Sequence, residues 1–231
     1  MTRKRNARVA GFTFLIYIAL GLSAMILSDR AISGAGTAAK LAGLTQHVPA
    51  MRLVVLLELG CCICALVLGV TLYAITRDQD PDLARLAMLC RVAEGVIAGA
   101  SLQKTVGRLW LATASGPAAP DAAAAGALGA FLLTLPDSSS TICATFFAFG
   151  STIFAFLLLR GRIVPVALGG LGVFASILIA VCLPLQLVGV VGSPITGLMW
   201  IPMLVFEVVL ALWFIVKGAA MPRRSLSEAR P

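Results

Sequence analysis

The chain has 231 residues, of which 60% are hydrophobic and 12% are charged, and its mean hydropathy is +1.01. Because soluble domains carry about 25% charged residues, this composition excludes an ordinary soluble domain and indicates one polytopic helical membrane domain over residues 1–231. The formal net charge of +8 does not indicate a nucleic-acid partner, because the basic residues stand at the ends of apolar runs.

The first apolar run predicts a transmembrane helix over residues 9–27. It follows a basic segment within residues 1–8 and is longer than the apolar part of a signal peptide, so we expect an uncleaved span. In the loop over residues 29–49, apolar residues recur at helical spacing, which predicts a short helix at the membrane interface. His47 in this loop is the only histidine, and a single histidine without nearby partners is a poor metal site.

The second apolar run predicts a span over residues 52–75, which contains Glu58. The third predicted span covers residues 83–108. Ahead of it, Asp80 followed by Pro81 has the pattern of a helix N-cap and the first helical residue. We therefore expect the two spans to be joined by a tight cytoplasmic turn.

The third span carries an arginine and a glutamate near its middle. Arg91 and Glu94 are three residues apart, a step that places both side chains on one face of a helix. The same face holds only small or polar residues, namely Ala87, Ala98, Ser101, Thr105 and Arg108. This pattern predicts close helix packing around a buried charged pair.

The second outer loop contains another short apolar segment. Asp121 is placed to cap a helix over about residues 122–135, and at about 14 residues this helix is too short to span a bilayer comfortably. We expect it to be interfacial or re-entrant. Three further spans complete the predicted all-α bundle of six transmembrane helices, over residues 139–159, 163–188 and 195–216, and the last of them contains Glu207.

The distribution of basic residues predicts the orientation. Of the 18 Lys and Arg residues, twelve fall on the side of the two termini, five fall on the opposite side, and Arg91 lies within a span. The positive-inside rule then places both termini of a multi-pass membrane protein in the cytoplasm. All six cysteines lie inside apolar runs, so we expect structural packing and neither a metal nor a cofactor.

Four ionisable residues lie away from the ends of the predicted spans: Arg91, Glu94, Glu58 and Glu207. A charged side chain at mid-depth costs about 2.5–3.5 kcal/mol on insertion scales, so each is expected to face the interior of the bundle. The predicted site is therefore a buried polar cluster of these four residues. Two interpretations stay open: an ionic clamp that fixes helix packing, or a polar pocket or proton path.

Short motifs spread over most of the chain carry a family resemblance: Arg8-Val-Ala-Gly11, Met51-Arg52, Arg91-Val-Ala, Arg160-Gly-Arg-Ile-Val-Pro165 and, in the last span, Pro202, Glu207, Trp213 and Lys217-Gly218. In these residues the chain resembles the DUF4386 family of bacterial integral membrane proteins. The resemblance implies the topology and points to Arg52, Arg91 and Glu207. A glutamine is usual in that family where Glu94 stands, and an aspartate is common where Glu58 stands.

The family carries no established activity, so the sequence predicts an inner-membrane protein of unknown role whose polar cluster braces the bundle or lines a small pocket. Possible accessory residues are Arg52, Ser101, Arg108 and Trp213. The alternatives are a small-solute, lipid or proton-coupled transporter and a regulatory membrane subunit. An enzyme ranks last, because no histidine cluster or serine with a base is visible. Membrane lipid is the expected partner, nucleic acid is not, and a protein partner or homo-oligomer stays open.

Overall fold

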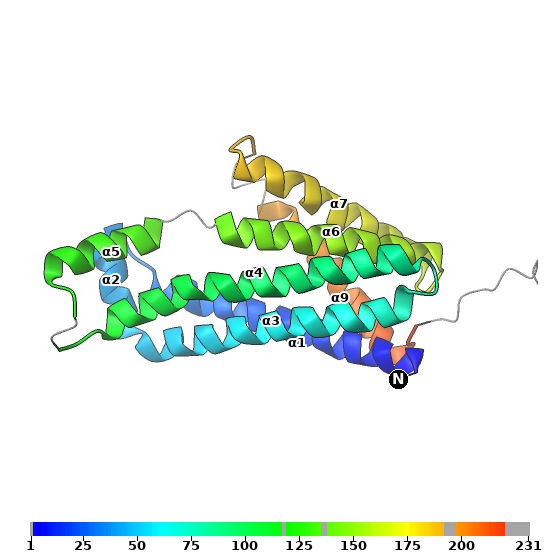
Figure 1. The fold of residues 1–231 in the computed structure, drawn as a ribbon, viewed down its shortest axis with the longest axis horizontal. Coiled ribbons are helices and arrows are strands. Elements are labelled where there is room, and N and C mark those ends of the chain that lie inside the picture. Colours follow the sequence, from blue (N-terminus) through cyan, green and yellow to red (C-terminus); the bar gives the residue numbers. More distant parts are fainter. Residues whose placement is uncertain (1, 117–118, 135–137, 192–196, 220–231) are drawn as a thin grey trace, which may run out of the picture.

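In a computed structural model of the chain, residues 2–116, 119–134, 138–191 and 197–219 are described, and within them the fold is entirely helical. The helices are α1 (Arg3–Ala31), α2 (Gly36–Gln46), α3 (Val48–Thr76), α4 (Pro81–Thr113), α5 (Ala122–Thr134), α6 (Ser138–Arg160), α7 (Val166–Leu187) and α9 (Trp200–Val216), as Figure 1 shows. For these residues the all-α prediction is confirmed.

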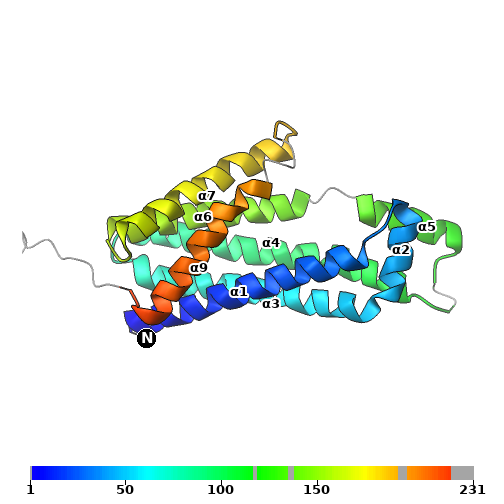
Figure 2. The same cartoon turned by 180° about the vertical axis from the view of Figure 1, so that it is seen from behind.

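The six longer helices form a closed ring. The neighbouring pairs around it are α1 with α3, α3 with α4, α4 with α6, α6 with α7, α7 with α9, and α9 with α1. Figure 2 shows α9 running obliquely between α7 and α1, so the last helix closes the ring on the first. In both views α7 diverges from α6 toward the end of the molecule that carries α2 and α5.

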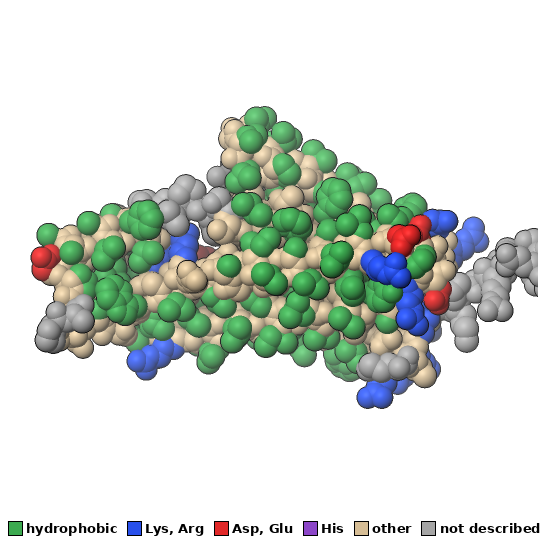
Figure 3. All heavy atoms as spheres, in the orientation of Figure 1, with side chains coloured by type: hydrophobic (Ala, Val, Ile, Leu, Met, Phe, Trp, Pro, Cys, Tyr) green, Lys and Arg blue, Asp and Glu red, His purple; other side chains and the backbone are tan. Residues whose placement is uncertain are grey.

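The two ends of the molecule differ. The N-terminus, the turn between α3 and α4 and the turn between α6 and α7 lie together at one end, while α2 and α5 lie at the other (Figure 1). On the face drawn in Figure 3, hydrophobic side chains cover the middle of the molecule and charged side chains gather toward the two ends. An apolar belt between polar ends is the arrangement expected of a membrane protein.

Four of the described helices are long and apolar enough to cross a membrane: α1, α3, α6 from Ser139 onward, and α7. The other two predicted spans coincide with α4, which carries charged residues along its length, and with α9, which has only 17 described residues. The structure thus supports a membrane protein, and the count of six transmembrane helices stays a prediction. Most helices extend beyond the predicted spans, because hydropathy marks only the apolar part of a helix.

Two predicted helix caps are confirmed. The side chain of Asp80 accepts hydrogen bonds from the backbone N–H groups of Asp82 and Leu83, at 3.2 and 3.0 Å, at the start of α4. The side chain of Asp121 accepts one from the N–H of Ala124, at 2.8 Å, at the start of α5. Each cap satisfies donors that a helix leaves without an internal partner and stabilises the helix by about 1 kcal/mol.

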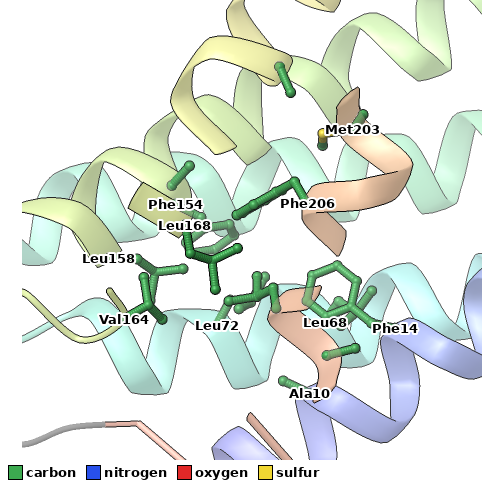
Figure 4. Packing of buried hydrophobic residues seen from close by; sticks show 14 of the residues in the cluster. Ala10, Phe14, Leu68, Leu72, Phe154, Leu158, Val164, Leu168, Met203 and Phe206 are labelled. Atoms are coloured by element: carbon green, nitrogen blue, oxygen red, sulfur yellow. The ribbon is translucent and has the colours of Figure 1, made fainter. Parts of the chain in front are cut away.

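The main core lies where the ring helices converge. Phe14 from α1, Leu68 and Leu72 from α3, Phe154 from α6 and Phe206 from α9 are buried in one cluster (Figure 4). Small residues allow the helices to come this close. A Cβ atom at Gly11 of α1 would stand only 2.7 Å from the backbone oxygen of Ala211 in α9. The contact that closes the ring therefore requires glycine at position 11.

Candidate functional site

The charged pair of α4 lies inside the ring. Nη1 of Arg91 is 2.8 Å from Oε2 of Glu94, and the two side chains are only 1% and 2% exposed. The pair is an i,i+3 contact on one face of α4, as the sequence spacing predicts. The close contact of Arg91 among the described side chains is this ion pair with Glu94.

Two aromatic rings complete the surroundings of the guanidinium. Its Cζ atom lies 5.0 Å from the ring centroid of Phe147 on α6 and 5.6 Å from that of Tyr17 on α1. At such distances the negative faces of the rings stabilise a cation, and more so in a site without water. The hydroxyl of Tyr17 also donates a hydrogen bond of 2.8 Å to Oε1 of Glu94. The pair of α4 is thereby linked to α1 and α6.

Glycines bring the neighbouring backbones close to this pair. A Cβ atom at Gly69 of α3 would stand 3.1 Å from Cβ of Arg91, and one at Gly150 of α6 would stand 3.0 Å from Cβ of Cys90. Both α3 and α6 therefore pack closely against α4 at the level of the buried pair. This enclosure leaves the charges no route to snorkel to a polar surface, so they depend on each other and on the rings.

Glu207 of α9 is also buried, with 6% of its surface exposed. It interacts electrostatically with Arg91 and Glu94 but forms no ion pair within 4.0 Å among the described residues, and its Oε1 has no hydrogen-bond partner there. It faces a small cavity of about 10 Å³ whose lining includes Ser151, Phe14 and Leu72. The structure thus places three of the four predicted residues near one another inside the bundle.

Glu58 takes a different position. It lines a cavity of about 350 Å³ between α1, α3, α4 and α6, in the half of the bundle nearer α2 and α5. Described residues of the lining are Gly21, Ala24, Met25, Ser28, Asp29, Glu58, Cys61, Ala98, Ser101, Leu102, Lys104, Thr105, Arg108, Ser140 and Cys143. Arg91, Glu94 and Glu207 are not among them. The predicted residues therefore divide between a closed ionic centre and a separate cavity, which we call the outer cavity.

Two thiols connect the outer cavity with the ionic centre. Cys143 of α6 donates a hydrogen bond of 3.4 Å to the backbone oxygen of Glu94, and Cys61 of α3 lies 3.8 Å from the backbone oxygen of Tyr17. Both cysteines line the deep end of the cavity. All six cysteines are free, and the described residues contain no group of three or more His, Cys, Asp or Glu arranged to hold a metal ion.

The possible accessory residues also lie in different parts of the structure. Ser101 and Arg108 line the outer cavity, and Nη2 of Arg108 donates a hydrogen bond of 3.1 Å to the backbone oxygen of Leu132 in α5. Arg52 is exposed near the start of α3. Trp213 is half-buried against the main core, on the last turns of α9. Arg52 and Trp213 are therefore not part of the ionic centre or of the cavity lining.

The family of the chain follows from a comparison with family models. The model described as "Domain of unknown function (DUF4386)" matches residues 9–218. The chain belongs to the DUF4386 family. The match runs from the first turns of α1 past the end of α9, so it covers the whole ring. Searches of the curated proteins and of the solved structures found no match to this chain. The resemblance seen in the sequence is confirmed, and it brings no activity with it.

Sequence reasoning missed three side chains of these sites. Tyr17 is one of only two tyrosines, and its place in the middle of an apolar span is a signal that a buried partner exists. Lys104 lies one turn from Arg108 on the same helix, and this spacing is a signal that both side chains could line one site. Phe147 carries no such signal, because its span contains many phenylalanines.

Proposed function

We propose that this member of the DUF4386 family is a six-span protein of the bacterial inner membrane, with both termini in the cytoplasm, that binds a small ligand in its outer cavity. In this proposal the pair of Arg91 and Glu94 braces the bundle, and the ligand contacts the residues around Glu58. The observation that carries the proposal is a cavity of about 350 Å³ between four helices of the ring, lined by several charged and hydroxyl side chains. Ligand sites of proteins usually have volumes of about 300–1,000 Å³.

With α9, helix α4 is one of the two elements on which the six-span assignment depends. Its 33 residues correspond to a length of about 50 Å, more than a bilayer requires. Its two central charges face inward, while Leu89, Val96 and Val106 on its outer side are 58%, 64% and 46% exposed. A helix that turns apolar side chains outward and keeps its charges within the bundle suits a lipid environment.

The topology leads to a measurable outcome. Fused after Gly218, green fluorescent protein should fluoresce in a bacterial host, because the fusion point lies at the cytoplasmic end. Alkaline phosphatase inserted after Ser115 should be active, because the loop between α4 and α5 lies on the opposite side. An active alkaline phosphatase fused after Gly218, or an inactive one inserted after Ser115, would contradict the orientation.

The outer cavity can be tested by filling it. Ala98 of α4 lines the deep end, so Ala98→Leu should place a larger side chain in the space that a ligand needs. We expect wild-type protein, extracted in mild detergent, to retain a small molecule detectable by native mass spectrometry, and Ala98→Leu to lose most of it.

Ala100→Leu is the matched control, because Ala100 lies two residues away on the same helix and is exposed on the outer side. It should retain the bound molecule at the wild-type level and unfold at a similar temperature. Equal retention by Ala98→Leu and Ala100→Leu would count against ligand binding in the cavity, as would a wild-type protein that retains nothing.

Two further roles are compatible with the same geometry. A carrier would need the outer cavity to open also toward the cytoplasmic end, and the thiols that contact Tyr17 and Glu94 mark where such a path would begin. A regulatory subunit would use ligand binding to change its contacts with a partner. The retained molecule is required by both roles, so the mass-spectrometric experiment precedes either.

A further inference from the structure

The charged residues of the outer cavity are divided by sign between its walls. Lys104 and Arg108 belong to α4 and lie one helical turn apart, whereas Asp29 belongs to α1 and Glu58 to α3. Helices α1 and α4 both line the cavity but are not neighbours in the ring, whereas α3, which carries Glu58, packs against both of them. Figure 3 shows basic side chains in the region between α5 and the start of α6.

We infer that the outer cavity binds a small zwitterionic amphiphile, a molecule with a primary ammonium group, a nearby oxyanion and an apolar body. The inference rests on the proposed function and names its ligand class. The ammonium group would contact the carboxylates of Asp29 and Glu58. The oxyanion would contact Lys104 and Arg108, which offer charge-assisted hydrogen bonds.

The apolar body is required by the gradient of polarity along the cavity. Toward α2 and α5 the lining includes Ser28, Asp29, Lys104, Thr105, Arg108 and Ser140, and Glu58 lies further in, one turn from Cys61 on α3. One to three helical turns deeper the lining includes Gly21, Cys61, Ala98 and Cys143, which are small and uncharged. From Ala98 to Arg108 the rise of α4 gives this gradient a length of about 15 Å. A purely polar solute would leave the deep end without a partner.

Size limits the part of the ligand that the cavity holds. A volume of 350 Å³ corresponds to roughly twelve water molecules at about 30 Å³ each, which is room for about as many non-hydrogen atoms. Two sources offer this chemistry at this size. One is a free apolar amino acid, and the other is the ethanolamine head group of a phospholipid whose acyl chains remain outside the cavity.

Binding assays on the purified full-length protein separate the charge requirements. L-leucine carries both charges and an apolar body, 4-methylpentanoate lacks the ammonium group, 3-methylbutylamine lacks the oxyanion, and glycine lacks the apolar body. For lipids, nanodiscs of phosphatidylethanolamine are compared with nanodiscs of phosphatidylglycerol by native mass spectrometry of the released protein. We expect the zwitterion to bind at least about tenfold more tightly than its single-charge analogues in one of these two series.

Single substitutions then test which side chain of the cavity contacts each charged group of the ligand. Lys104→Met and Glu58→Gln should each weaken binding of the zwitterion by about tenfold. Lys104→Met should also bind L-leucine and 3-methylbutylamine equally well, because the oxyanion has lost its partner. Glu58→Gln should bind L-leucine and 4-methylpentanoate equally well, because the ammonium group has lost its partner. Lys217→Met removes a basic residue at the exposed end of α9 and should leave binding unchanged.

The outcomes distinguish this inference from the proposed function. Preference for L-leucine supports a soluble amino acid, and preference for phosphatidylethanolamine supports a lipid. If 4-methylpentanoate binds as tightly as L-leucine or more tightly, and phosphatidylglycerol as tightly as phosphatidylethanolamine or more tightly, the inference of a zwitterionic ligand is wrong. The cavity would then be an anion site. If no probe binds while Ala98→Leu still removes a retained molecule of another kind, the zwitterion is wrong and the ligand-binding function stands. If no probe binds and nothing is retained, both are wrong.

Discussion

Arg91→Ala is expected to lower the free energy of unfolding of the detergent-solubilised protein by about 3–5 kcal/mol, because removing one partner of a buried ion pair leaves the other charge without compensation. In this protein the residual charge is the carboxylate of Glu94, which is 2% exposed and whose Oε2 contacts only the guanidinium at close range. The loss is measurable by thermal or detergent-induced unfolding of the purified variants.

Adding Glu94→Gln to Arg91→Ala should restore part of the loss. The double variant removes both charges of the pair, and the hydroxyl of Tyr17 can still donate its hydrogen bond to the amide oxygen. Tyr17→Phe, which removes only that hydrogen bond, should cost about 1–3 kcal/mol. Arg85→Ala is the control on the same helix. Its ion pair with Asp82 has side chains 59% and 87% exposed, so its loss should cost about 1 kcal/mol or less. Similar stabilities of Arg91→Ala and Arg85→Ala would refute the bracing role.

Gly11→Val should destabilise the protein by about 3 kcal/mol, because it forces apart the two helices that close the ring. A Cβ atom at Gly11 would lie 2.7 Å from the backbone oxygen of Ala211 and 2.8 Å from Cγ1 of Ile215, so α1 and α9 must separate to accept it. A backbone atom cannot move aside as a flexible side chain can. The expected loss of stability is therefore at the upper end of the range usual for overpacked cores.

Gly170→Val provides the comparison for the same chemical change. Gly170 lies in α7, and nothing stands within 4 Å of the position that its Cβ would occupy. Its unfolding midpoint should stay near that of the wild type, or rise slightly, because valine favours a helix more than glycine does. An unchanged midpoint for Gly11→Val would mean that α1 and α9 do not pack as described.

Local patterns predicted the parts of this structure that depend on neighbours in the sequence. The caps at Asp80 and Asp121 and the contact between Arg91 and Glu94 each involve residues within a few positions of one another. A local pattern is enough for such contacts, because the geometry of one helix determines them. The burial of this pair could be predicted from energetics alone, because a charged side chain that faces lipid raises the free energy of the protein.

The assignment of Glu58 to the same cluster went beyond what the sequence can support. Its depth in the second span resembles that of a cluster member, but which residues it meets depends on how α3 is rotated about its own axis. That rotation is set by packing against α1 and α4, which involves residues far apart in the chain. The same holds for Phe147, whose ring lies against Arg91 only because α6 packs against α4.

The contact of α9 with α1 has a consequence for biogenesis. Synthesis from the N-terminus completes α1, α3 and α4 early, and the ion pair with its tyrosine partner can assemble among them. The backbone at Gly11, however, lacks its neighbour in α9 until the ribosome has released the segment up to Val216. Until then the nascent protein is an open arc of helices, because the contact of α9 with α1 that closes the ring cannot form.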